Sequence, residues 1–240
     1  MRLVSTEPAF ESISVAVLCF RLPMEITVVL AHPDRHSFNH AIAQTVCRTL
    51  ERAGHVVCFH DLYAEGFDPL LPCSELDPKA QPAPDLARYC DELQRADGLV
   101  VVHPNWWGQP PAAMKGWIDR VFRPGVAYRF QVGDDGEGVP AGLLRAQTAI
   151  VFNTANTPPQ REMEVFGDPL DGLWKKCIFA FCGVNTVVRQ TFSVVIASTP
   201  EQRASWLREV EETVGASFPE DGPEAVQTLL GPEESLIELP

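Results

Sequence analysis

The sequence predicts an α/β protein with a parallel β-sheet that is covered by helices on both faces. Apolar runs of strand length alternate along the chain with segments of helical length. Because these runs are continuous, they are typical of strands that are buried on both sides. Residues that start and stop helices separate the segments, so each strand–helix–strand unit is expected to be a right-handed crossover.

The first half of the chain is expected to contain three strands and two helices. In chain order these elements span residues 26–31, 40–52, 55–60, 85–96 and 98–103. His32-Pro33 ends the first strand. Ser37 and Asn39 supply N-cap chemistry for the first helix, and Gly54 ends that helix.

The second half is expected to contain three helices and two strands. In chain order they span residues 110–122, 147–152, 168–181, 186–196 and 200–214. Pro111 suits the first turn of its helix, and Gly183 stops the helix that Asp168 begins. Residues 198–201 (STPE) combine a cap, a proline and an acid, which is a strong helix start. The glycine-rich residues 124–143 are expected to be an irregular excursion.

Five such strands suit a flavodoxin-like, doubly wound sheet of order 2-1-3-4-5, in which ligands bind beyond the carboxyl ends of the strands. One domain is expected over residues 24–215. Residues 1–23 do not fit the pattern and are expected to be an extension. It is either a product of start-site assignment, since Met24 directly precedes the first strand, or a loosely attached arm. Residues 216–240 are expected to be an exposed tail.

Charge and cysteine content narrow the class of protein. The chain carries 19 basic and 32 acidic side chains, a formal charge of −13, which disfavours binding to nucleic acid. No apolar run reaches the length of a membrane helix. The seven cysteines are odd in number and lack a C-x-x-C pair, so we expect reduced thiols and a cytoplasmic location.

The segment after the first strand, residues 31–40, could hold a phosphate. It lacks the glycine patterns of dinucleotide-binding loops and P-loops, but Ser37 and Asn39 lie at a helix N-terminus. A simple helix cap explains these two residues equally well. His32, His36 and His40 are spaced by four, yet Pro33 prevents one helical face from holding all three, so no metal site is predicted.

Two further segments follow the third and fourth strands and should lie at the same edge of the sheet. Trp106 and Trp107 offer flat faces and indole N–H groups to an aromatic ligand, although core or dimer packing is an alternative explanation. Residues 153–159 (NTANTPP) could supply donors to polar ring atoms, or could serve only as a turn.

Taken together, these segments resemble the flavodoxin-like NAD(P)H:quinone oxidoreductases, whose bacterial members include potassium-efflux ancillary oxidoreductases. The resemblance covers roughly residues 24–215. The matching motifs are Ala31-His-Pro, Ser37-Phe-Asn39, Asp61-Leu-Tyr63, Pro104-Asn-Trp-Trp107, Lys115-Gly-Trp, Arg120-Val-Phe122, Gly125, Ala127-Tyr128 and Phe181-Cys-Gly183.

The resemblance implies a homodimer with a flavin, FAD or FMN, at the strand ends, and NAD(P)H as co-substrate. The residues that match the flavin phosphate segment are His32, Ser37, Phe38 and Asn39. Those that match the loop along the isoalloxazine are Pro104, Asn105, Trp106 and Trp107, and Thr154 and Asn156 fall near its pyrimidine side. Trp107 and Tyr128 are expected in the substrate pocket.

One departure from the resemblance concerns proton transfer. The mammalian-type enzymes carry Gly-Gly and then a Tyr/His pair in the loop after the fourth strand. This chain has Ala155-Asn156 there, followed by Gln160, Arg161 and Phe166. A Tyr/His relay is therefore not supported, and no side chain is predicted to be an essential acid or base.

We therefore predict a flavin-dependent enzyme that resembles NAD(P)H dehydrogenase (quinone). It would reduce quinones or similar flat electrophiles by ping-pong hydride transfer, with the flavin carrying the chemistry. Two alternatives stay open: a redox-sensing flavin-binding ancillary subunit of a transporter, and a one-electron carrier like flavodoxin.

Overall fold

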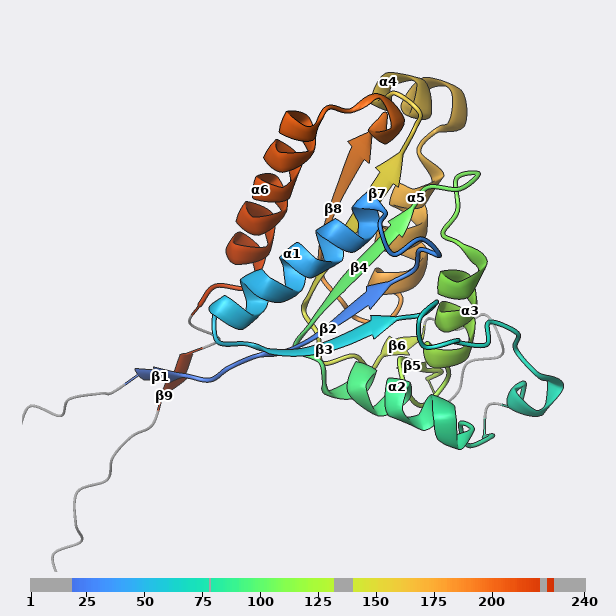
Figure 1. Ribbon diagram of the computed structural model, residues 1–240. Helices are drawn as coiled ribbons and strands as arrows, with labels where there is room; N and C mark the ends of the chain where they lie inside the picture. Colours follow the sequence, from blue (N-terminus) through green and yellow to red (C-terminus); the bar gives the residue numbers. More distant parts are fainter. Residues whose placement is uncertain (1–18, 78, 132–139, 221–223, 227–240) are drawn as a thin grey trace, which may run out of the picture. The chain divides into compact units, whose positions relative to one another are not determined.

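The computed structural model describes residues 19–77, 79–131, 140–220 and 224–226, and the chain divides into two compact units (Figure 1). The larger unit runs from Pro23 to Gly222. In the smaller unit, β1 (Cys19–Arg21) pairs antiparallel with β9 (Glu224–Val226), where the sequence predicted no strand. The remainder of the predicted extension and most of the predicted tail lie outside the described residues.

Five parallel strands form the sheet of the larger unit, in the order β3-β2-β4-β7-β8. Their bounds are Glu25–Leu30 (β2), Val56–Asp61 (β3), Gly98–Pro104 (β4), Thr148–Ala155 (β7) and Thr186–Ser193 (β8). In chain order this is 2-1-3-4-5, so the predicted topology is confirmed. Val28 lies opposite Phe59 on β3 and Val100 on β4, a register that brings the carboxyl ends of these strands to one edge.

Helices cover both faces of this sheet (Figure 1). Their bounds are Phe38–Arg52 (α1), Pro84–Arg95 (α2), Ala112–Val121 (α3) and Pro200–Ser217 (α6). α1 and α6 lie side by side on one face, and α2 and α3 lie on the other. The Ser37 hydroxyl caps α1 by accepting from the His40 amide, and Thr199 caps α6 in the same way through Gln202.

The two covered faces form two separate hydrophobic cores. On one face, Ile42 of α1 and Val210 of α6 are fully buried with Val100 and Phe152 of the sheet. On the other, Trp117 of α3 is buried in the cluster that also holds Trp174. Burial of each such side chain stabilises the fold by roughly 1.5–3 kcal/mol, so the sheet edge that carries the site is firmly supported.

The predicted helix over 168–181 is present, but it begins at Pro169 and its hydrogen-bonding pattern changes from α to π at Leu173. Asp168 has a left-handed backbone (φ 45°), and a short helix, α5 (Pro169–Gly172), continues as a π-helical segment from Leu173 to Ala180. The Asp168 carboxylate receives two hydrogen bonds from Arg189 of β8, at 2.7 and 2.8 Å. A contact with a distant strand thus sets the conformation where local helix signals alone predicted a regular start.

Four other segments differ from the prediction or add to it. The fifth strand ends at Ser193, and Val194 (φ 62°) leads into a 3₁₀ turn at Val195–Ala197. Residues 159–166, which the sequence left unassigned, form α4 (Pro159–Arg161) and a π-helical turn, Glu162–Phe166. The excursion over 124–143 contains a two-stranded pair, β5 (Tyr128–Arg129) with β6 (Ala141–Gly142). A 3₁₀ turn, Cys73–Glu75, lies in the long connection to α2.

Of the helices in the described part of the chain, none is both long and apolar enough to cross a membrane.

Candidate active site

A groove of about 440 Å³ lies at the carboxyl ends of β2, β4 and β7. We call it the Ser37 groove. It is lined by His32, Ser37, Phe38, Asn39, Pro104, Asn105, Trp106, Thr154, Ala155, Asn156, Thr157, Val195, Ile196 and Arg203. The structure thus brings nine of the ten residues that the sequence proposed for the cofactor to one place. The tenth, Trp107, lines the cavity next to it.

One end of the Ser37 groove is the N-terminus of α1. As at any helix start, the amides of Phe38 and Asn39 have no acceptor within the helix, and they form the positive end of the helix dipole. Arg203 of α6 lines the same groove and adds a positive charge. Amides, a hydroxyl and a guanidinium are the donors that a phosphate group prefers.

The Ser37 hydroxyl is held by a chain of hydrogen bonds. Ser37 Oγ lies 3.0 Å from His40 Nδ1, and His40 Nε2 lies 3.0 Å from Asp61 Oδ2. The other Asp61 oxygen accepts from the amides of Tyr63 and Ala64. The Asp61 carboxylate accepts a hydrogen bond from His40 Nε2–H, and Nδ1 faces the Ser37 hydroxyl.

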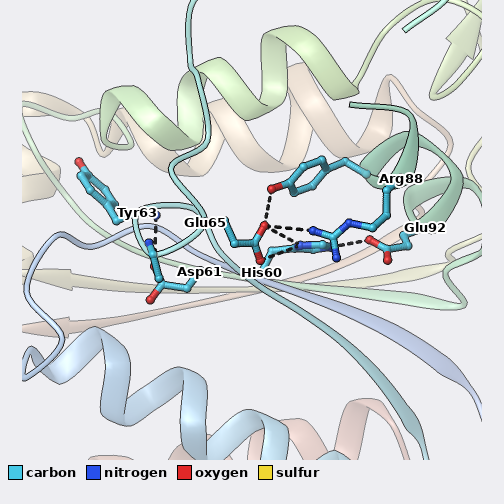
Figure 2. Close-up of polar contacts among 8 residues, drawn as sticks. His60, Asp61, Tyr63, Glu65, Arg88 and Glu92 are labelled. Atoms are coloured by element: carbon cyan, nitrogen blue, oxygen red, sulfur yellow. Dashed lines mark hydrogen bonds and ion pairs between the residues drawn. The ribbon is translucent and has the colours of Figure 1, made fainter. Parts of the chain in front are cut away.

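A second cluster of polar side chains surrounds His60, the residue before Asp61, and ties the end of β3 to α2 (Figure 2). His60 is buried between two carboxylates, with Nδ1 3.2 Å from Glu65 and Nε2 2.6 Å from Glu92. Glu65 also accepts from Tyr89 and from Arg88. Figure 2 shows these groups converging beside Asp61 and Tyr63, so the cluster fixes the loop that carries Asp61.

The Asn39 side chain serves the fold rather than the groove. It is buried, and its Nδ2 donates to Thr154 Oγ1 at 2.9 Å, which joins α1 to the end of β7. Only the backbone amide of Asn39 is therefore free to meet a phosphate. This contact was not foreseen, because the two residues are 115 positions apart.

The two tryptophans occupy a tight hairpin. Trp106 and Gln109 exchange backbone hydrogen bonds at 3.0 Å, with Trp107 (φ 58°) and Gly108 (φ 70°) between them. Both central residues have positive φ, the pattern of a type I′ turn, which is costly for a bulky residue such as Trp107. The Trp107 ring is fully exposed, and the half-exposed Trp106 ring lies 6.1 Å from that of His32.

A second cavity, of about 490 Å³, adjoins the Ser37 groove. We call it the Trp107 cavity. Its lining residues are Asn105, Trp107, Gly108, Ala155, Thr157, Glu162, Phe166 and Pro169. Asn105, Ala155 and Thr157 line both hollows, so a ligand in one lies against a ligand in the other.

Tyr128, which the sequence placed in the substrate pocket, lines neither hollow within this chain. It lies on β5, with its ring 5.6 Å from Phe130 and 5.0 Å from Phe181. Phe130 is exposed and Phe181 is partly exposed, so the three rings form an apolar surface patch.

A buried network supports the floor of the site. The wholly buried His103 bonds the Pro104 carbonyl through Nδ1 at 2.8 Å, and its Nε2 accepts from the Trp174 indole at 2.9 Å. Burial lowers the pKa of His103 to about 4, so the ring is neutral. Asn153 bonds the same ring and accepts from Arg189, which reaches Asp168.

Sequence reasoning missed the two charged residues of the site, Arg203 and Glu162. Arg203 lies in the first turn of α6, which starts after β8 at the same sheet edge as α1, so topology could have found it. Glu162 follows the Pro158-Pro159 pair that opens α4 directly after β7. The prolines signalled a helix start, but not that Glu162 would be buried beside the Trp107 cavity.

The residues of the Ser37 groove fit a flavin mononucleotide moiety. The α1 amides, the Ser37 hydroxyl and Arg203 provide a phosphate cradle. The exposed face of Trp106 can lie along a flat ring system, and Asn156 supplies a polar group just after β7, where the Thr154 hydroxyl is already bonded to Asn39. The groove therefore offers the types of group that such a moiety needs, and in the order in which its phosphate and rings would meet them.

Comparisons with known proteins point in the same direction. The family described as flavodoxin-like fold matches residues 24–214. A Haemophilus influenzae protein named as an uncharacterized NAD(P)H oxidoreductase is 32% identical over 176 residues, 70% of this chain and 83% of the relative. Rattus norvegicus NAD(P)H dehydrogenase (quinone) 1 is 27% identical over 202 residues, 75% of this chain and 72% of the relative. An FMN-dependent NADH-azoreductase from Bacillus anthracis, solved in complex with FMN, shares the fold with a TM-score of 0.65 at 14% identity, covering 80% of this chain and 98% of that one.

Proposed function

This chain belongs to the flavodoxin-like family of NAD(P)H oxidoreductases and quinone reductases, and on that premise we propose that it is a flavin-dependent enzyme that transfers hydride from NAD(P)H to a quinone or similar flat electrophile. The observation that carries the proposal is the shared wall of the two hollows. Asn105, Ala155 and Thr157 separate a phosphate-cradling groove from a cavity with aromatic walls. Such an arrangement suits a bound cofactor beside an exchangeable flat substrate.

In this proposal the residues of the chain bind the cofactor and orient the substrates. The start of α1, with Ser37 and Arg203, would hold the phosphate of the cofactor, and Trp106 would lie along its rings. A bound flavin would supply the redox chemistry, by accepting hydride from the nicotinamide and passing it to the acceptor with a proton from solvent. The stretch after Ala155-Asn156 carries Gln160, Arg161 and Phe166, all exposed, so the proposed mechanism uses no Tyr/His relay.

One cavity serves two substrates in turn. The Trp107 cavity is open beside the groove and, at about 490 Å³, is of a size for one flat ring system at a time. Nicotinamide and acceptor would therefore exclude one another, which produces ping-pong kinetics.

The decisive experiment is cofactor loading followed by half-reactions. The purified protein is titrated with FMN and with FAD while flavin absorption and fluorescence are recorded, and the loaded protein is then mixed rapidly with NADH or NADPH. We expect uptake of one flavin, bleaching by a nicotinamide cofactor and parallel double-reciprocal lines with a quinone. A protein that binds neither flavin contradicts the proposal, and accumulation of a one-electron-reduced flavin favours the electron-carrier alternative.

We also propose that the enzyme is a homodimer. The patch of Tyr128, Phe130 and Phe181 and the exposed Trp107 ring are apolar surfaces of the kind that mark subunit contacts. A substrate role for Tyr128 would then require the second copy, since Tyr128 lines neither the Ser37 groove nor the Trp107 cavity. Sedimentation analysis of the wild type and of Phe130→Ser tests this, because a monomer in both contradicts it.

A further inference from the structure

One charged side chain is buried at the wall of the Trp107 cavity. Glu162, the first residue of the turn after α4, is 9% exposed. It lines the Trp107 cavity and also a smaller one behind it, of about 160 Å³. A carboxylate is seldom buried without a function or a partner, because removal from water disfavours its charge.

The carboxylate is held in a fixed position by Asn105. The Asn105 Nδ2 donates to Glu162 Oε1 at 2.9 Å, and the Asn105 Oδ1 accepts from the Gly108 amide at 2.9 Å. Both ends of the amide are thus committed, which fixes its orientation. A carboxylate has about four acceptor positions, and Asn105 fills one of them.

The arginine that lines a cavity together with Glu162 does not neutralise it. Arg189 lines the smaller cavity, but its guanidinium is engaged by Asp168 at 2.7 and 2.8 Å and lies 3.5 Å from Asp171. Among the residues that the structure describes, no ion pair involves Glu162. The cavity therefore presents a negative charge to whatever enters it, in a protein whose formal charge is already −13.

A simple quinone fits this wall poorly. Its carbonyl oxygens are hydrogen-bond acceptors, and a carboxylate without a proton repels them. A ring that carries an N–H or O–H group, or a positive charge, would satisfy the open acceptor positions of Glu162 instead. The rings of Trp107 and Phe166 on the same cavity suit a flat cationic ligand as well.

We propose that Glu162 selects the electron acceptor: the physiological acceptor is a flat aromatic electrophile that bears a hydrogen-bond donor or a positive charge, such as an aminoquinone, a hydroxyquinone or a cationic heteroaromatic ring. This rests on the proposed function, since it names the substrate class of that site. Asn105 is the positioning residue that holds the carboxylate in place.

The experiment compares Glu162→Gln with Glu164→Gln. Glu164 lies two residues away in the same turn, is exposed and lines neither cavity, so its variant removes the same charge from the surface. Binding of two redox-inert probes, the N-methylquinolinium cation and the naphthalene-2-sulfonate anion, is measured by calorimetry on the flavin-loaded protein. In parallel, kcat/KM is measured for 1,4-naphthoquinone, its 2-sulfonate and a derivative with a trimethylammonium group.

We expect the wild type to prefer the cation to the anion in both assays. Loss of the Coulomb attraction between the Glu162 carboxylate and the cationic ring should reduce that preference roughly 10- to 100-fold in Glu162→Gln. Glu164→Gln should keep it, and so should Glu162→Asp, which retains the charge. Thermal melts of the variants check folding.

Two results would overturn the inference. If Glu162→Gln and Glu164→Gln lose the preference for the cation equally, the net charge of the protein alone sets that preference. If Glu162→Gln keeps the preference for the cation but turns over every acceptor more slowly, Glu162 has a role other than selecting the acceptor. If the protein takes up no flavin, the proposed function fails, but calorimetry on the flavin-free protein still decides whether Glu162 recognises the cationic probe.

Discussion

The buried ring of His103 makes the stability of this protein depend on pH in a calculable way. Burial lowers its pKa from 6.5 to about 4 in the folded state. The unfolded chain therefore binds the proton more readily, so protonation between these two pKa values favours unfolding. Stability from this group is fully present above pH 6.5 and is lost as the pH falls toward 4.

The size of the effect follows from the two pKa values. Going from about pH 7.5 to about pH 4.5, linkage gives a loss of about 2.5 kcal/mol in the free energy of unfolding from His103 alone. In structural terms, a second proton on the ring would need to sit on Nε2, which accepts from the Trp174 indole. Protonation therefore breaks that hydrogen bond and places a charge near Arg189.

Urea unfolding at a series of pH values measures the effect. In His103→Gln the amide oxygen can still accept from Trp174, but no group titrates, so the fall in stability between about pH 7.5 and 4.5 should be smaller by about 2.5 kcal/mol. His36→Gln is the matched control, because His36 is exposed. If His103→Gln loses stability on acidification as steeply as the wild type and the control, the ring is not the buried neutral group described above.

Three further predictions follow from the site. Ser37→Ala should weaken flavin binding by roughly 1.5–3 kcal/mol, measured by fluorescence titration, and an unchanged affinity would leave Ser37 as a helix cap only. Trp107→Gly should relieve the strain of a positive φ and raise the melting temperature while lowering turnover with NAD(P)H; a lower melting temperature would show that the ring is needed for the hairpin. Asp168→Ala should destabilise the fold by about 3 kcal/mol in urea unfolding, because the buried Arg189 loses its two shortest carboxylate contacts and keeps only Asp171 at 3.5 Å, and Arg189→Met in the same background should restore part of that loss. A double variant no more stable than Asp168→Ala would contradict this.

The strands, two helix starts and the position of the Ser37 groove could be predicted from the sequence. The strands were predictable because continuous apolar runs such as residues 98–103 have few alternatives to a buried parallel strand. Helix starts at Ser37 and Thr199 were predictable because their side chains cap their own first turn, a local interaction. The Ser37 groove followed from these, since parallel topology alone places the carboxyl ends of neighbouring strands at one edge.

Contacts between residues far apart in the chain could not be predicted from local sequence patterns. Asn39 reads as a cap residue, yet its side chain bonds Thr154 and leaves only its amide to the groove. Asp168 reads as a helix start, yet Arg189 holds it in a left-handed conformation. Glu162 carries no local signal at all. Its burial beside the Trp107 cavity depends on Asn105, 57 positions earlier, and no local pattern encodes a pairing over that distance.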